Sequence, residues 1–139
     1  LGIVGMGRIG QAIAKRAAAF DMDISYHTRS QRADVAYKYV ANLVDLATQV
    51  DYLVAITPGG AGTKNLINAE VLKALGPQGF LVNVARGSVV DQAALIEALV
   101  TALPWITAPF SMHRFRAYIK HSLASSLTPS KVGSSLFFV

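Results

Sequence analysis

The sequence predicts an α/β fold in which a doubly wound parallel sheet lies between two layers of helices. Apolar runs at 1–5, 52–56 and 80–84 lack the polar alternation of a half-exposed strand, so they predict strands buried on both faces. Segments with helical spacing separate the strands, and right-handed crossovers place such helices on both faces of a sheet. The pattern stops near residue 100, so we expect a sheet that is incomplete on its C-terminal side.

The first half of the pattern contains three strands and one helix. Residues 1–5 end in glycine and form the first strand, and residues 23–27 alternate in polarity and form the second. A weaker third strand is expected near 37–40. Between the first two strands, apolar side chains recur every three or four residues and predict one helix face, at Ile9, Ile13, Ala17 and Phe20.

The second half repeats the alternation of helix and strand. Asn68 and Asp91 are predicted to cap two of its helices, because short polar side chains can accept hydrogen bonds from the free amides of a first turn. Proline and paired glycines in 57–60 predict a loop after the fourth strand. The expected elements are helices at 43–50, 68–75 and 93–100 and strands at 52–56 and 80–84.

Charge and serine are unevenly distributed along the 139 residues. The net charge is +5, yet residues 101–139 hold four basic and no acidic residues, together with seven of the ten serines. We therefore divide the chain into a domain at 1–100 and an aberrant, basic, serine-rich tail at 101–139 of uncertain structure. The excess charge belongs to the tail, which matches no recognised nucleic-acid-binding fold, so we expect no nucleic-acid partner.

Other classes of protein are excluded by composition. The chain is 53% apolar and 15% charged, which does not fit a disordered protein. It has no cysteine, so a thiolate metal site is excluded, and we expect no metal centre. No run approaches about 18 apolar residues and no secretory signal is visible, so we expect a cytoplasmic protein without a membrane partner.

The first strand is followed by a glycine-rich turn of the form G-x-G-x-x-G. Gly5 permits a tight turn, Gly7 allows a pyrophosphate to approach the backbone, and Gly10 allows the helix to pack against the strand. The amides of Arg8 and Ile9 would face the phosphates at the positive end of the helix. The context predicts a Rossmann-like, NAD(P)-binding domain. The competing interpretation is a structural glycine turn without a ligand.

The end of the second strand bears on the choice of cofactor. NAD-binding domains place a carboxylate near this point to hold the ribose 2′-hydroxyl, whereas this chain has His27, Thr28, Arg29 and Ser30. A 2′-phosphate would find a guanidinium and two hydroxyls, with Arg32 close behind. The segment favours NADP, with NAD as the alternative cofactor. The competing interpretation is that both arginines are ordinary surface residues.

Four blocks of sequence resemble the D-isomer-specific 2-hydroxyacid dehydrogenases, especially their glyoxylate/hydroxypyruvate reductase branch. They are LGIVGMGRIGQAIAKRAAAF at 1–20, YHTRS at 26–30, ITPGGAGTKNLINAEVLKALGP at 56–77 and VNVARGSVVDQAALIEAL at 82–99. The resemblance implies hydride transfer from a nicotinamide cofactor to a small 2-keto acid, which yields a D-2-hydroxy acid. It also implies that nucleotide domains pair into a homodimer in the full-length family.

The resemblance implies roles for five further residues. Thr57 and Pro58 would lie beside the riboses of the cofactor, and Val84, Ala85 and Arg86 would border the nicotinamide. Arg86 would be the catalytic arginine that pairs with the substrate carboxylate and polarises the keto group. A planar guanidinium suits this role because it can donate two parallel hydrogen bonds to a carboxylate.

The resemblance weakens beyond residue 100. The family carries a catalytic glutamate and then a histidine in a Thr-Pro-His-x-Gly-Ser block, but no acidic residue follows Glu97, and Ser130 and Lys131 stand where the histidine belongs. No motif surrounds His113 or His121. We therefore expect the chain to be a fragment that is inactive alone, and one hypothesis for the tail is a shifted reading frame or mis-joined exon. The alternative function is a non-catalytic dinucleotide-binding or dimerisation module.

Overall fold

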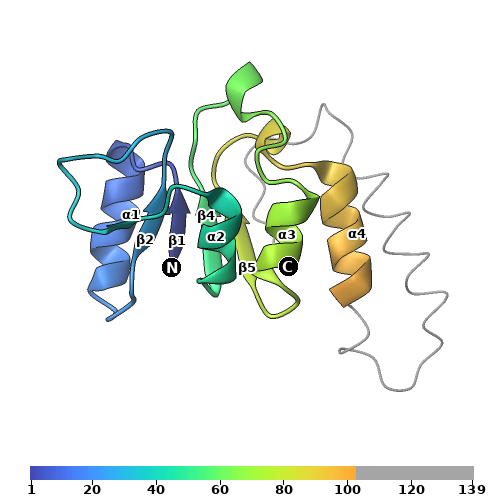
Figure 1. Cartoon of the computed structure of the whole chain (residues 1–139), viewed down its shortest axis with the longest axis horizontal. Helices are drawn as coiled ribbons and strands as arrows, with labels where there is room; N and C mark the ends of the chain where they lie inside the picture. The colour runs from blue at the N-terminus through green and yellow to red at the C-terminus, as the bar shows by residue number, and fades with distance from the viewer. Residues whose placement is uncertain (103–139) are drawn as a thin grey trace.

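A computed structural model describes residues 1–102 (Figure 1). Strands and helices alternate along this part of the chain except that β3 follows β2 directly, and two short 3-10 turns lie in the loops. The elements are β1 (Gly2–Val4), α1 (Arg8–Ala18), β2 (Ser25–His27), β3 (Lys38–Tyr39), α2 (Leu43–Thr48), β4 (Tyr52–Ala55), η1 (Ala61–Thr63), α3 (Ala69–Leu75), β5 (Phe80–Asn83), η2 (Gly87–Val89) and α4 (Gln92–Ala102). No helix in these residues is both long and apolar enough to cross a bilayer.

The five strands form one parallel sheet in the order β3-β2-β1-β4-β5. The chain runs outward from β1 through β2 to β3, crosses back, and continues outward on the other side through β4 and β5. The direction of winding therefore reverses between β1 and β4. The predicted doubly wound, Rossmann-like sheet is confirmed, and ligands of such sheets bind at this point of reversal, beyond the carboxyl ends of the strands.

Two apolar cores lie on opposite faces of the sheet. Ile3 packs with Ala14 of α1, whereas the adjacent Val4 packs with Leu46 of α2 and Leu72 of α3. Neighbouring residues of a strand point to opposite faces, so α1 covers one face while α2, α3 and α4 cover the other. Figure 1 shows α1 beside β1 and β2, and α4 next to α3. The expected three-layer arrangement is confirmed.

Polar side chains begin three of the helices. Asn68 and Asp91 accept hydrogen bonds from the amides of Val71 and Ala94, at 3.0 and 3.1 Å, so both predicted caps are confirmed. Asn42, which the sequence patterns did not single out, caps α2 in the same way.

The division of the chain at residue 100 stays a prediction. The last described helix runs to Ala102, which is two residues past that boundary. The rest of the expected tail, residues 103–139, lies outside the described part of the chain and includes Ser130 and Lys131.

Candidate dinucleotide-binding site

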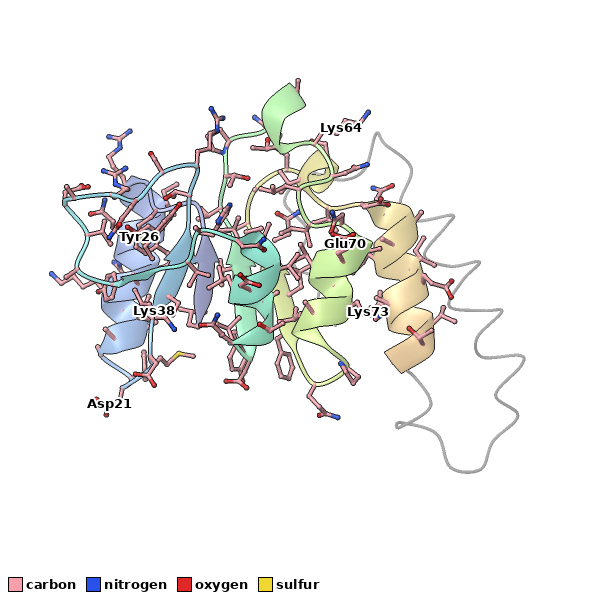
Figure 2. All side chains as sticks on the ribbon, in the orientation of Figure 1. Asp21, Tyr26, Lys38, Lys64, Glu70 and Lys73 are labelled. Atoms are coloured by element: carbon pink, nitrogen blue, oxygen red, sulfur yellow. The ribbon has the colours of Figure 1, made fainter. Side chains whose placement is uncertain are left out.

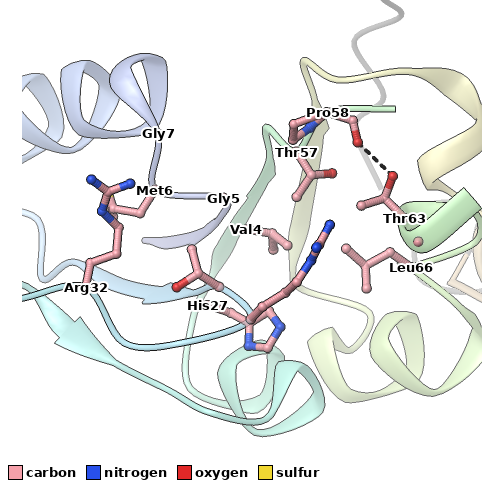
Figure 3. A pocket seen from close by; sticks show the side chains of 13 residues that line it. Val4, Gly5, Met6, Gly7, His27, Arg32, Thr57, Pro58, Thr63 and Leu66 are labelled. Carbon is pink, nitrogen blue, oxygen red and sulfur yellow. Dashed lines mark hydrogen bonds between the residues drawn. The ribbon is translucent and has the colours of Figure 1, made fainter. Parts of the chain in front are cut away.

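A cavity of about 280 Å³ lies beyond the carboxyl ends of β1, β2 and β4 (Figure 3). Seven of the site residues expected from the sequence line it: Gly5, Gly7, His27, Thr28, Arg29, Thr57 and Pro58. Arg8, Ile9 and Gly10 continue from this lining into α1. The cavity thus occupies the position where the strand order reverses.

The glycine turn has the geometry that the motif requires at two positions. Gly5 has φ +104°, and its amide donates to the carbonyl oxygen of His27 at 3.0 Å. A Cβ atom on Gly5 would lie 2.9 Å from the carbonyl oxygen of Ile56, the residue that follows β4, and one on Gly10 would overlap the Gly5 carbonyl. Side chains at either position would therefore separate β1 from its neighbours or push α1 away from the sheet.

Gly7 has a different role from the other two glycines. A Cβ atom there would meet no atom within 4 Å, so the space beside it is open. Gly7 begins α1 with extended backbone and offers no side-chain cap, and the first turn of the helix carries no acidic residue. The amides of that turn are consequently free to receive an anion at the positive end of the helix, as a pyrophosphate requires.

The loop after β4 contributes a buried hydroxyl without a partner. The Oγ1 atom of Thr57 is buried and makes no hydrogen bond among the described residues. Such an atom costs free energy unless a ligand or water satisfies it. Thr63 shapes the same loop by donating from its hydroxyl to the carbonyl oxygen of Pro58 at 2.7 Å (Figure 3). The unsatisfied hydroxyl and the open space at Gly7 both fit a bound dinucleotide.

Five lining residues were missed by the sequence analysis: Val4, Met6, Gly62, Thr63 and Leu66. The last three lie in the η1 turn or shortly after it, and a hydrogen bond from the Thr63 hydroxyl to the carbonyl oxygen of Pro58 holds this turn against the loop after β4. The sequence marked this segment only as a loop. Its run of small residues before Thr63 was the one available signal of a tight turn.

At the end of β2, local hydrogen bonds fix the side chains. His27 approaches the carbonyl oxygen of Val40 through Nδ1 at 3.1 Å; since a carbonyl only accepts, Nδ1 carries the proton. The Thr28 hydroxyl donates to the carbonyl oxygen of Ser30 at 2.7 Å, so it is committed locally rather than free for a ligand. Arg29 is exposed and its Nη2 atom reaches toward Gly62, across the cavity.

Arg32 also lines the cavity, but it is paired. Its Nε and Nη2 atoms donate to the two carboxylate oxygens of Asp34 at 2.9 and 2.7 Å. The hydrogen bond from Arg32 lowers the pKa of the Asp34 carboxyl, and the same bond raises the pKa of Arg32. Residues 27–30 hold no carboxylate, as the sequence shows, but the loop that follows places the carboxylate of Asp34 against Arg32, which lines the cavity.

Val84, Ala85 and Arg86 follow β5 and lie outside the lining of this cavity. The exposed Arg86 side chain passes over Gly59, where a Cβ atom would lie 2.8 Å from Arg86 Cγ. The guanidinium stem therefore rests against the loop that follows β4. This places Arg86 next to the cavity, at the adjacent strand end.

Comparisons with known proteins agree with this geometry. A family model described as "D-isomer specific 2-hydroxyacid dehydrogenase, NAD binding domain" matches residues 1–102. Hydroxyphenylpyruvate reductase from Plectranthus scutellarioides is 48% identical over 100 residues, which are 72% of this chain and 32% of that protein. The chain therefore spans about a third of the length of the curated relatives it matches.

Two solved structures show the same likeness. The NADPH-dependent glyoxylate/hydroxypyruvate reductase from Sinorhizobium meliloti, in complex with NADP and malonate, is 51% identical with a TM-score of 0.71, over 73% of this chain and 32% of that one. The NAD-complexed D-isomer specific 2-hydroxyacid dehydrogenase from Lactobacillus delbrueckii ssp. bulgaricus is 28% identical with a TM-score of 0.68, over 73% and 31%.

Proposed function

The chain belongs to the D-isomer specific 2-hydroxyacid dehydrogenases, and on this premise we propose that residues 1–102 bind a nicotinamide dinucleotide for the reduction of small 2-keto acids. The substrates would be of the glyoxylate and hydroxypyruvate type, and the products D-2-hydroxy acids. The observation that carries the proposal is the start of α1, where Gly7 leaves open space and no side chain caps the helix.

Three groups of this chain would hold the dinucleotide. The amides at the start of α1 would bind the pyrophosphate, because they lack partners within the helix. The Thr57 hydroxyl would gain the hydrogen-bond partner that it lacks. The ring of His27, which lines the cavity and is held through Nδ1 by the carbonyl oxygen of Val40, would contact the adenosine end.

We propose that NADP is preferred to NAD. Arg29 supports this preference because it is exposed at the cavity and no carboxylate lies within 27–30 to repel a 2′-phosphate. The relative from Sinorhizobium meliloti is described with NADP, while the one from Lactobacillus delbrueckii is described with NAD. Calorimetric titration of the chain with NADPH and NADH tests the proposal; tighter binding of NADH would contradict it.

Arg86 is the proposed catalytic residue. When bound, the nicotinamide supplies a hydride to the keto carbon. The Arg86 guanidinium would pair with the substrate carboxylate through two hydrogen bonds and draw electron density from the keto oxygen. Because Arg86 rests against the loop after β4, it lies near the cavity without occupying it. This pairing needs the planar guanidinium of arginine, so a lysine at position 86 should not support the same role.

A second candidate function is dinucleotide binding without turnover. It is favoured by Ser130 and Lys131, which stand where the family carries its proton-donating histidine. An unperturbed serine is not a proton donor near neutral pH, and an unperturbed lysine is poorly matched to the task. Oxidation of NADPH that depends on hydroxypyruvate separates the two functions. Measurable turnover by this chain excludes the second candidate, whereas binding without turnover excludes the first for this chain.

Assembly and location are the remaining parts of the proposal. We expect the nucleotide domains to pair into a homodimer, as the family resemblance implies, and the protein to act in the cytoplasm on a small-molecule substrate. Sedimentation of the chain at several concentrations tests the dimer, and microscopy of a tagged protein tests the location.

A further inference from the structure

An ion pair lies at the rim of the cavity, beside the end of β2. Arg32 uses two nitrogens to contact both carboxylate oxygens of Asp34, at 2.9 and 2.7 Å. In Figure 3, Arg32 lies on the same side of the cavity as Gly7 and Met6, away from Thr63. This is the side on which α1 and the end of β2 approach each other, where a dinucleotide would place its adenosine ribose.

The buried residue Tyr26 anchors this pair to the fold. Its side chain is fully buried against Ala14 on the α1 face of the sheet (Figure 2). The Tyr26 hydroxyl accepts a hydrogen bond from the backbone amide of Arg32 at 3.0 Å. The backbone of Arg32 is therefore fixed to the core, although its side chain is 40% exposed. A ligand at the rim would meet a guanidinium in a set position.

That guanidinium is already engaged. A 2′-phosphate would bind it best through two parallel hydrogen bonds, and Asp34 makes two such bonds now. The phosphate would also approach a carboxylate of like charge. A ribose 2′-hydroxyl meets neither obstacle. Asp34 should therefore weaken the binding of a 2′-phosphorylated nucleotide without weakening that of its unphosphorylated counterpart.

We propose that Asp34 is a determinant of cofactor choice that limits the preference for NADP by holding the guanidinium of Arg32. The inference rests on the proposed dinucleotide site and names a residue that moderates its selectivity. Arg29 has no such partner among the described residues, so it would supply the preference that Asp34 moderates.

The test compares the binding of 2′,5′-ADP and 5′-AMP, and of NADPH and NADH, by calorimetry on the whole chain. The variant Asp34→Asn removes the charge and keeps the size of an exposed side chain. We expect it to raise the preference for the 2′-phosphorylated member of each pair by about fivefold, on the scale of one charge-assisted hydrogen bond. Asp23→Asn is the matched control, because Asp23 is also an exposed aspartate but precedes the first residue of β2, at the end of the strand away from the cavity. The nucleotide preference of this variant should stay within about twofold of the parent's preference.

A double-mutant cycle shows whether Asp34 acts through Arg32. In an Arg32→Gln background, the same substitution of Asp34 should no longer raise the preference. The inference is overturned if Asp34→Asn leaves the preference unchanged or lowers it, or if the gain persists without Arg32. A parent chain that binds none of the four nucleotides would contradict the proposed function and this inference together, whereas normal binding with an unaltered preference contradicts the inference alone.

Discussion

The side chain of Asn83 closes the turn that carries Arg86. Its Nδ2 atom donates to the Arg86 carbonyl oxygen at 3.1 Å, and its Oδ1 atom accepts from the Ala85 amide at 3.0 Å. Asn83 is only 2% exposed, at the last position of β5. A buried amide that satisfies both groups of a turn fixes the path of the backbone, and here it directs the chain back past the end of β4.

This relationship predicts a loss of stability. Asn83→Ala leaves the Ala85 amide and the Arg86 carbonyl without their side-chain partner, so the free energy of unfolding should fall by about 1–3 kcal/mol. Chemical denaturation measures the change. Gln78→Ala, at an exposed position before β5, is the control and should stay within about 0.5 kcal/mol of the parent. Equal effects from both substitutions would refute the role of Asn83.

Substitution by alanine should affect different properties at two glycines of the turn: mainly nucleotide affinity at Gly7 and mainly stability at Gly10. At Gly7, the N-cap of α1, the new methyl group meets no protein atom, so the free energy of unfolding should fall by no more than about 1 kcal/mol, the difference between glycine and alanine at this position. It would occupy the space left for the pyrophosphate, so NADPH affinity should fall by about tenfold, which corresponds to about 1.4 kcal/mol. Calorimetry and thermal unfolding measure the two effects. Unchanged affinity would place the nucleotide elsewhere.

Gly10→Ala should instead damage the fold. The added Cβ would overlap the Gly5 carbonyl oxygen, which is backbone and cannot rotate away. The free energy of unfolding should therefore fall by about 1–3 kcal/mol, the usual cost of overpacking a tight interior. Denaturant unfolding measures it. A Gly10→Ala variant as stable as the parent would show that α1 can move from the strand without cost.

Thr57→Val should separate stability from binding. The substitution keeps the shape of the side chain and removes a buried hydroxyl that has no partner, so the free chain should become more stable by about 1 kcal/mol. The NADPH complex loses a hydrogen bond, and its affinity should fall by about fivefold to tenfold. A loss of stability on this substitution would mean that the hydroxyl is already satisfied in the free protein.

The fold and the glycine turn could be predicted because their signals are local. Gly5 must adopt a positive φ directly after a strand, and Gly10 lies in the first turn of the helix that follows, so a short pattern specifies both. The doubly wound parallel sheet followed from apolar runs and the handedness of crossovers. The caps at Asn68 and Asp91 were visible for the same reason, since each acts on amides three residues ahead.

The missed residues depend on loops whose paths no periodicity encodes. Asp34 meets Arg32 because the backbone after β2 is fixed by Tyr26, which lies six residues before Arg32 in the chain. Thr63 reaches the cavity through the η1 turn, and its hydroxyl bonds a carbonyl five residues back. Asn83 was assigned to a strand without a further role, since its two partners become visible only once the turn to Arg86 is built.

Titration of the isotopically labelled chain with NADPH, followed through backbone amide chemical shifts, tests the central claim most directly. A nucleotide bound beyond β1 and β4 should shift the amides of Gly7, Arg8, Ile9 and Thr57 in a saturable manner, and Gly7→Ala should weaken these shifts. Absence of shifts at the glycine turn, or shifts confined to the basic residues 101–139, would contradict a dinucleotide site at the start of α1.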